Sequence, residues 1–185
     1  GEEAVCKGEI FNLTASGNDN SNYTWYRSEM KDGNEIEGAN GEVYSPTINS
    51  TEKYVVKGEN TFGCLGSAVF TVKAKEYPTF TANDTTSCKG MPSTVKVKTG
   101  NADYYTWTWH NNGKQESING TSYSEILTAT RTYQLTGTKE GCTTTPITVT
   151  ANVNELPILT INSKQNIGET PITMCFNDID TLIVS

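Results

Sequence analysis

The chain has 185 residues, of which 35% are hydrophobic and 9% aromatic, and a formal charge of −7 at pH 7. An acidic chain without a cluster of Lys or Arg is not suited to bind nucleic acid or anionic lipid. The sequence has no apolar run long enough to span a membrane and no signal-peptide core at its start.

The predicted elements are short strands separated by turns. Alternating apolar residues mark strands at 11–16, 68–74 and 147–153, with FNLTAS as the first example. Turn sequences such as NDN, DGN and NNG lie between such segments. This pattern is typical of antiparallel strands with one buried face and one wet face. Two sheets of this kind must pack together, so the sequence predicts an all-β fold of immunoglobulin-like β-sandwiches.

The chain repeats itself. The matching segments, in chain order, are CKG at 6–8 and 88–90, YTW at 23–25 and 105–107, FGC at 62–64 with EGC at 140–142, and YPTFT at 77–81 with LPILT at 156–160. We therefore predict tandem repeats with boundaries at 1–76, 77–156 and 157–185. The first repeat has no counterpart of the TFTAN that precedes Cys88, and the third is cut short. We expect a segment of a longer tandem array.

The five cysteines follow the repeat. Cys6 and Cys64 occupy the same places in the first copy as Cys88 and Cys142 in the second. The simplest interpretation is one disulfide within each domain, Cys6 to Cys64 and Cys88 to Cys142, with Cys175 unpaired or linked to a further part of the array. Disulfides imply an oxidising compartment, hence an extracellular or cell-surface location. A metal site is disfavoured because there is no CxxC motif and His110 is the only histidine.

The aromatic stretch YYTWTWH at 104–110 divides between the two faces of a strand. Tyr105 and Trp107 match Tyr23 and Trp25 of the first copy, so we predict that both pairs are core. Trp109 aligns with Arg27 and is predicted to lie at the rim. Together with Tyr26 and Tyr104, it is a candidate for surface contact with a ligand.

The framework of the repeat reads C-x-G, an alternating strand, Y-x-W, a strand with Tyr, G-C, and x-P before the next unit. It resembles the tandem Ig-like repeats of very large surface and secreted proteins of Bacteroidetes, including gliding-motility adhesins exported by the type IX system. The resemblance covers the whole chain and implies a stalk or adhesin without catalysis. The framework positions are Cys6, Gly8, Trp25, Tyr54 and Cys64, and Cys88, Gly90, Trp107, Tyr133 and Cys142.

The same resemblance directs attention to DTT at 84–86 and DTL at 180–182, which fit a short motif for O-glycosylation in that phylum. Thr85 and Thr181 are the candidate acceptors, and coincidence is an equal alternative in a chain so rich in Thr. Several N-x-T triplets also occur, but about as many are expected by chance, so they do not establish a eukaryotic glycoprotein.

Residues for catalysis are missing. The chain has one histidine, no G-x-S-x-G motif and no H-E-x-x-H motif, so only catalysis by carboxylates would be possible. We interpret the acidic residues of the first repeat as solvent-exposed charges on loops. No cofactor is expected. Bound calcium is an alternative, for which Asp19, Asp178 and Asp180 are candidate ligands.

These observations favour a non-catalytic segment of a long extracellular protein, acting as a stalk or as a multivalent adhesin. Its partners would be neighbouring repeats, and cell-surface glycans or proteins. One alternative is a glycan- or protein-binding accessory module of a secreted enzyme, which would need coplanar exposed rings. Another is a filament subunit that exchanges strands between chains, in which another chain adds a strand against residues 1–16 or 157–185.

Overall fold

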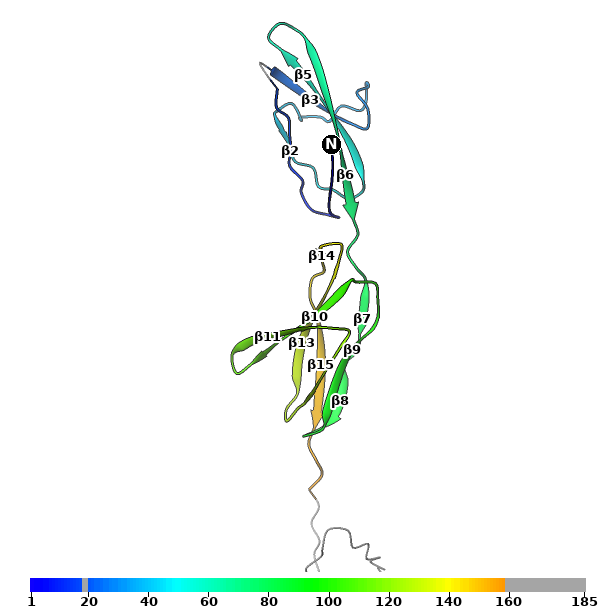
Figure 1. Cartoon of the computed structure of the whole chain (residues 1–185), viewed down its shortest axis with the longest axis vertical. Coiled ribbons are helices and arrows are strands. Elements are labelled where there is room, and N and C mark those ends of the chain that lie inside the picture. Colours follow the sequence, from blue (N-terminus) through cyan, green and yellow to red (C-terminus); the bar gives the residue numbers. More distant parts are fainter. Residues whose placement is uncertain (18–19, 159–185) are drawn as a thin grey trace, which may run out of the picture. The chain divides into compact units, whose positions relative to one another are not determined.

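The structure is a computed structural model and describes residues 1–17 and 20–158. These ranges contain fifteen strands and no helix (Figure 1). Residues 1–155 form one compact unit. The predicted third repeat therefore lies almost entirely outside the described residues. Below, repeat 1 denotes residues 1–76 and repeat 2 residues 77–156.

Repeat 1 consists of two sheets whose strands pair only with one another among the described residues. The first has the order β1-β6-β5-β3 and the second pairs β2 with β4. The strands are β1 (Glu2–Cys6), β2 (Leu13–Thr14), β3 (Asn20–Arg27), β4 (Val43–Tyr44), β5 (Glu52–Asn60) and β6 (Leu65–Lys75). The pairs β3–β5, β5–β6 and β2–β4 are antiparallel, whereas β1 runs parallel to β6.

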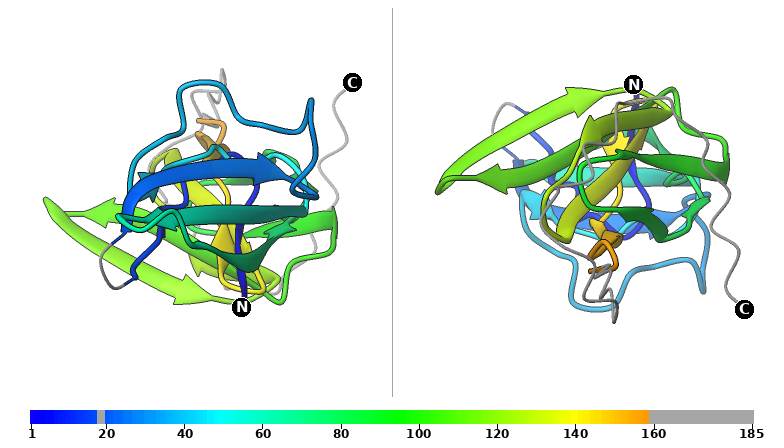
Figure 2. Two further views of the ribbon diagram at one scale, coloured as in Figure 1. Left: turned by 90° about the horizontal axis from the view of Figure 1, so that it is seen from above. Right: turned by 90° about the horizontal axis from the view of Figure 1, so that it is seen from below.

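Repeat 2 has the same plan with more strands. One sheet has the order β11-β10-β13-β15-β8, with β14 added to β13, and the other has the order β12-β9-β7. The strands are β7 (Phe80–Ala82), β8 (Thr85–Cys88), β9 (Pro92–Gly100), β10 (Tyr104–Asn111), β11 (Lys114–Asn119), β12 (Ser122–Ile126), β13 (Arg131–Lys139), β14 (Cys142–Thr143) and β15 (Ile147–Asn154). The turn end of the β10–β11 hairpin, in light green, extends beyond the other strands of repeat 2 (Figure 2).

Each repeat has its own core, formed by inward-facing residues of both of its sheets. In repeat 1 the buried cluster includes Leu13 of β2 and Trp25, Tyr54 and Val72 of the facing sheet. In repeat 2 the equivalent cluster includes Val95, Trp107, Tyr133 and Ala151. Burial of such side chains on both inner faces is what holds a β-sandwich together. The chain therefore has the all-β, Ig-like sandwich fold that its strand pattern predicts.

The two central tryptophans make the same hydrogen bond. Trp25 Nε1 donates to the carbonyl of Gly41 at 2.9 Å, and Trp107 Nε1 donates to the carbonyl of Gly120 at 3.0 Å. Both rings are almost fully buried, with exposures of 3% and 0%. A buried indole N–H needs such a partner because leaving it unpaired costs free energy. These residues lie in the core, as do Tyr54 and Tyr133, each 1% exposed.

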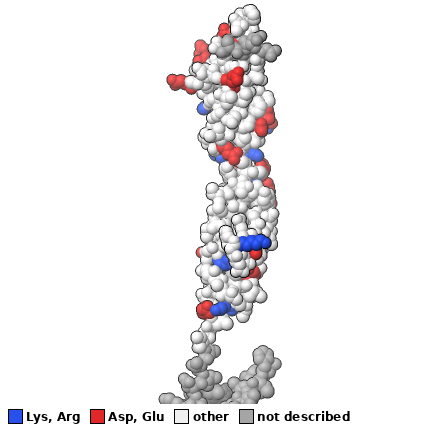
Figure 3. Space-filling view, turned by 90° about the vertical axis from the view of Figure 1, so that its left-hand side faces the viewer, with Lys and Arg blue, Asp and Glu red and all other residues white. Residues whose placement is uncertain are grey.

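On the face of the surface drawn in Figure 3, acidic and basic side chains form small groups, some with opposite charges side by side, and uncharged surface lies between these groups. No helix in the described part of the chain is long and apolar enough to cross a membrane.

Candidate functional site: the joint between the repeats

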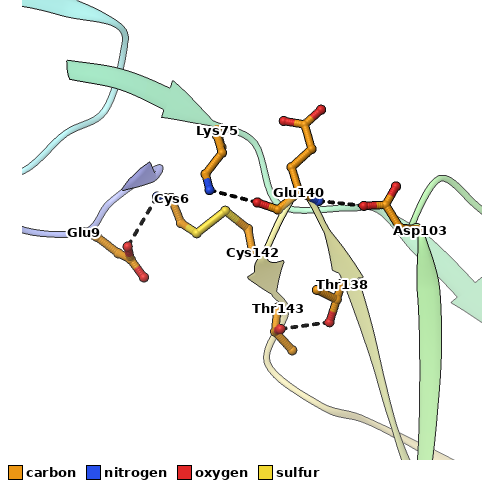
Figure 4. Close-up of a disulfide and its surroundings, with 8 residues drawn as sticks. All are labelled: Cys6, Glu9, Lys75, Asp103, Thr138, Glu140, Cys142 and Thr143. Carbon is orange, nitrogen blue, oxygen red and sulfur yellow. Dashed lines mark hydrogen bonds between the residues drawn. A yellow bond between two sulfur atoms is a disulfide. The ribbon is translucent and has the colours of Figure 1, made fainter. Parts of the chain in front are cut away.

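A single disulfide joins the two repeats. It links Cys6, at the end of β1, to Cys142, at the start of β14, with a Cα–Cα distance of 5.7 Å (Figure 4). This separation lies in the usual range for a disulfide. Both cysteines are buried, with exposures of 8% and 0%. The joint thus has two covalent connections, the peptide chain and this bond.

The prediction of one disulfide within each repeat is wrong. Cys6 pairs in register with Lys75, the last residue of β6, whereas Cys64 immediately precedes Leu65, the first residue of that strand. A strand rises about 3.3 Å per residue, so the length of β6 separates the two cysteines by roughly 35 Å. That is far beyond the limit of about 7 Å for a bond.

The same geometry separates the other predicted pair. Cys88 lies beside Asn154, the last residue of β15, and Cys142 is at the opposite end of that repeat, beside Lys139. Cys64 and Cys88 are both free and exposed. The structure therefore bonds the C-x-G cysteine of one repeat to the G-C cysteine of the next.

Polar contacts flank the disulfide on the G-C turn. Lys75 Nζ of repeat 1 donates to the carbonyl of Glu140 at 2.8 Å, and the amide of Glu140 donates to Asp103 Oδ2 at 2.7 Å (Figure 4). Glu140 and Gly141 both have positive φ values, 49° and 84°. In this turn the carbonyl of Glu140 accepts from Lys75, the Cys142 sulfur is bonded to Cys6, and Asp103 holds the turn from within repeat 2.

The peptide connection is also held in place. Pro78 is buried, and Thr79 exchanges two hydrogen bonds with Asn101: the Thr79 amide donates to Asn101 Oδ1 at 2.8 Å, and the Asn101 amide donates to the Thr79 carbonyl at 3.2 Å. Proline restricts the backbone of the segment further. Residues 76–79 therefore form a short, ordered connection.

An ion pair recurs at the C-terminal end of each repeat. Lys7 Nζ lies 2.9 Å from Glu76 Oε1 in repeat 1, and Lys89 Nζ lies 3.1 Å from Glu155 Oε2 in repeat 2. Both lysines belong to a CKG turn, and both glutamates precede a Tyr-Pro or Leu-Pro dipeptide. Exposed pairs of this kind add little stability, but their recurrence shows that the two ends are built alike. The signal for this pair is present in the sequence, as a CKG turn and a Glu that precedes an x-P dipeptide in each repeat.

Two of the three aromatic candidates for surface contact are buried, which corrects their assignment. Tyr26 is 4% exposed because the loop after β3 folds over it, and its hydroxyl donates to Glu35 Oε1 at 3.0 Å. Trp109 is 5% exposed and stacks on Tyr123 with ring centroids 4.7 Å apart. Of the three, Tyr104 alone is on the surface, with an exposure of 50%. They do not form a shared platform.

Each central tyrosine donates its hydroxyl proton to a carboxylate. Tyr54 bonds to Glu52 Oε2 at 2.9 Å, and Tyr133 bonds to Glu125 Oε1. Burial raises the pKa of both phenols, and the adjacent carboxylates raise the pKa further. Both tyrosines are therefore neutral hydrogen-bond donors inside the sandwich. This arrangement is structural, since neither ring is accessible.

The remaining candidate sites stay predictions. Thr85 is half-buried in β8, next to Asp84, whose Oδ1 accepts the amide of Thr150 at 2.8 Å. Thr181 and Cys175 lie outside the described residues, as do the calcium candidates Asp19, Asp178 and Asp180. Within residues 1–17 and 20–158, no group of three or more His, Cys, Asp or Glu side chains could hold a metal ion.

Comparison with known proteins gives only distant structural similarity. No protein-family model matches the chain, and no curated protein matches it. Similar solved structures include the fibronectin(III)-like modules of Clostridium thermocellum CbhA, with 12% identity over 87% of this chain and 95% of that chain and a TM-score of 0.41. A complex of Dpr11 IG1 with DIP-gamma IG+IG2 has 15% identity over 82% and 94%, with a TM-score of 0.36. At these TM-scores the similarity carries no argument, and the fold described above rests on strand pairing.

Proposed function

We propose that this chain is a non-catalytic, load-bearing segment of a long extracellular protein, in which Ig-like repeats are linked end to end as a stalk or multivalent adhesin. The observation that carries the proposal is the Cys6–Cys142 disulfide, which joins two successive repeats. A disulfide persists in an oxidising environment, which agrees with an extracellular location. The resemblance to Bacteroidetes surface repeats suggests the class of parent protein.

The topology of this bond determines which residues carry tension. If the chain is pulled at its two ends, force passes from residue 6 through the disulfide to residue 142. Residues 7–141 lie inside the closed loop and are not stretched, although they contain most of both sandwiches. A segment built in this way keeps its length under load even when its strands separate.

Single-molecule pulling at the two termini tests this role. In oxidising buffer we expect no extension from the closed loop. Adding dithiothreitol should release roughly 450 Å of chain, because the two cysteines are 136 residues apart in sequence and an extended chain spans about 3.3–3.6 Å per residue.

Two cysteine variants serve as a matched pair in this experiment. Cys142→Ser should release the whole length without reductant, whereas Cys64→Ser should behave as the unchanged protein because Cys64 is free. An oxidised protein that extends fully, with no change on reduction, would refute the load-bearing role.

The accessory-module alternative loses its main support, since Tyr26 and Trp109 are buried. Recognition of sugars by ring stacking needs exposed rings that lie in one plane, and the three predicted residues supply one exposed ring.

A further inference from the structure

The outer face of the larger sheet of repeat 2 lacks charged side chains along its three central strands. In β10, β13 and β15, residues alternate so that Trp107, Tyr133 and Val149 face the core and their neighbours face outwards. The outward positions of these strands, all within the described residues, hold no Asp, Glu, Lys or Arg. We use the term neutral face for the six side chains at its centre, which are Thr106, Thr108, Gln134, Thr136, Thr148 and Thr150.

The fold does not require this composition, because repeat 1 differs at the same places. The counterparts of Thr108, Gln134, Thr136 and Thr148 are apolar or basic, namely Tyr26, Val55, Lys57 and Val69. Tyr26 is 4% exposed, because the segment after β3 lies over it and pairs with it at Glu35. Repeat 1 thus covers this place with its own chain.

In repeat 2 the corresponding place is a groove of about 580 Å³. Polar side chains dominate its walls, among them Thr108, Gln134 and Thr136 of the neutral face and His110 and Gln115 of the β10–β11 hairpin. Arg131 also lines the groove, but its guanidinium lies 2.9 Å from the carboxylate of Glu125. The volume is typical of a ligand site, whereas such a polar lining does not suit an apolar small molecule.

The side chains of the neutral face can make further hydrogen bonds. Gln134 Nε2 donates to Thr148 Oγ1 at 3.1 Å. A glutamine amide nevertheless has a second donor and an acceptor oxygen, and a threonine hydroxyl both donates and accepts. Groups of this kind match the hydroxyls of a sugar. Phosphate, sulfate and carboxylate ligands would instead need cationic partners, which the outward positions of these strands do not supply.

An extended peptide fits this face less well than a sugar does. Peptides add to a sheet at a free strand edge, whereas β13 is paired with β10 on one side and with β15 on the other. The face therefore offers side chains and no backbone groups. These side chains recur about every 4.8 Å from strand to strand, so a ligand with hydroxyls on each of its units can bond to several of them at once.

We propose that the neutral face binds an uncharged, linear oligosaccharide, which lies in the groove and accepts and donates hydrogen bonds with Thr108, Gln134 and Thr136 instead of stacking on rings. A ligand held by a few bonds of this kind binds with a Kd of about 1 mM. The inference goes beyond the load-bearing role, because the face would bind the sugar whether or not the Cys6–Cys142 disulfide carries force.

NMR titration of the ¹⁵N-labelled full chain tests the ligand class. The probes are neutral oligosaccharides of glucose, mannose and xylose, namely cellohexaose, maltohexaose, mannohexaose and xylohexaose, and the acidic hexagalacturonate serves as the control. We expect one or more of the neutral sugars to shift the amide signals of Thr108 and Gln134, and the acidic sugar to bind at least about tenfold more weakly. No shift with any neutral sugar at about 10 mM, or equal binding of the acidic one, would overturn the proposal.

Two double variants locate the site. Thr108→Val with Gln134→Val removes a hydroxyl and an amide from the groove, and we expect binding at least about tenfold weaker. Repeat 1 has Val55 at the place of Gln134, so the fold accommodates valine there. The matched control is Thr81→Val with Thr99→Val, an exposed pair on the other sheet, which should bind as the unchanged protein does.

The thermal unfolding midpoints of both variants check that they are folded. Unchanged binding by the first variant, or an equal loss in both, would place the sugar elsewhere and reject the neutral face as the site. These titrations use the oxidised chain without load. A negative result would therefore reject the sugar site alone, and the pulling experiment tests the load-bearing role separately.

Discussion

Glu125 holds together the polar part of the repeat 2 interior. Its carboxylate accepts the hydroxyl of Tyr133, and both of its oxygens lie 2.9 Å from Arg131 Nη1. The Arg131 and Glu125 side chains are only 24% and 20% exposed. In repeat 1, Glu52 bonds Tyr54 in the same way, but its partner Arg27 is 3.5 Å away and 61% exposed.

This difference predicts unequal costs for removing the two carboxylates. Glu125→Ala leaves a half-buried guanidinium and a buried hydroxyl without their acceptor, so we expect a loss of about 2–3 kcal/mol in the free energy of unfolding. Glu52→Ala should cost about 1 kcal/mol, because water screens and solvates Arg27. Urea denaturation of both variants measures the losses. Equal losses would contradict this account.

The raised pKa values of Tyr54 and Tyr133 predict sensitivity to alkali. Burial and the neighbouring carboxylates raise both phenol pKa values above their ordinary value of about 10. The resulting stability is fully present below the pKa of the unfolded chain and is lost as the pH rises above about 10 towards the folded-state pKa. Urea denaturation between pH 8 and 11 should show this fall.

Tyrosine variants test whether the two buried phenols cause this loss of stability at high pH. Tyr54→Phe with Tyr133→Phe should flatten the dependence on pH, whereas Tyr104→Phe, at an exposed ring, should leave it unchanged. A double variant that loses stability with pH as steeply as the unchanged protein would assign the effect to other groups.

At the scale of elements, β10 shows how one strand divides its side chains between core and surface. Trp107 and Trp109 both point into the sandwich, and Trp109 also packs against Tyr133, with ring centroids 5.7 Å apart. Tyr104, at the start of the strand, is half exposed. The repeat alignment predicts that Trp109 lies at the rim. In the structure, the buried part of β10 instead continues past Trp107 to include Trp109.

Alanine substitutions in β10 test which of these side chains contribute to the core. Trp109→Ala should cost about 3–5 kcal/mol, as expected for a large aromatic removed from a core, whereas Tyr104→Ala should change stability by less than about 0.5 kcal/mol. Thermal or urea unfolding of both variants makes the comparison. A small effect of Trp109→Ala on stability would contradict this account and indicate that the ring lies at the rim of the sandwich.

The sequence predicts the parts of the fold that depend on local periodicity. Alternation in segments such as 11–16 and 147–153 identifies one-sided strands, and self-comparison identifies Trp25 and Trp107 as equivalent. The place of Tyr26 could not be predicted in this way, because a loop covers a face that the strand alone leaves open. Trp109 was misplaced because its counterpart in the other copy is Arg27.

The cysteine pairing was beyond prediction for a topological reason. Which end of a sandwich a cysteine occupies depends on the register of long-range strand pairs, such as the parallel pairing that places Cys6 beside Lys75. A repeat shows that Cys6 and Cys88 are equivalent, but it does not show whether their partners lie in the same repeat or in the next one.

At the scale of the whole chain, the Cys6–Cys142 disulfide links two successive repeats covalently. Neither sandwich contains an internal disulfide among the described residues. The disulfide that is present, Cys6–Cys142, lies at the joint between the two repeats. The chain-entropy model assigns a closed loop of this length about 5 kcal/mol, and here that contribution is shared by two domains. The stabilisation by this disulfide therefore depends on both neighbouring repeats, and so does the covalent path that it provides between them.

Disulfide mapping by mass spectrometry of the unreduced protein tests this central claim most directly. After proteolysis without reductant, we predict one linked peptide pair that contains Cys6 and Cys142, with Cys64 and Cys88 recovered as alkylated thiols. Linked pairs that contain Cys6 with Cys64, and Cys88 with Cys142, would contradict the account and return each disulfide to the interior of a single repeat.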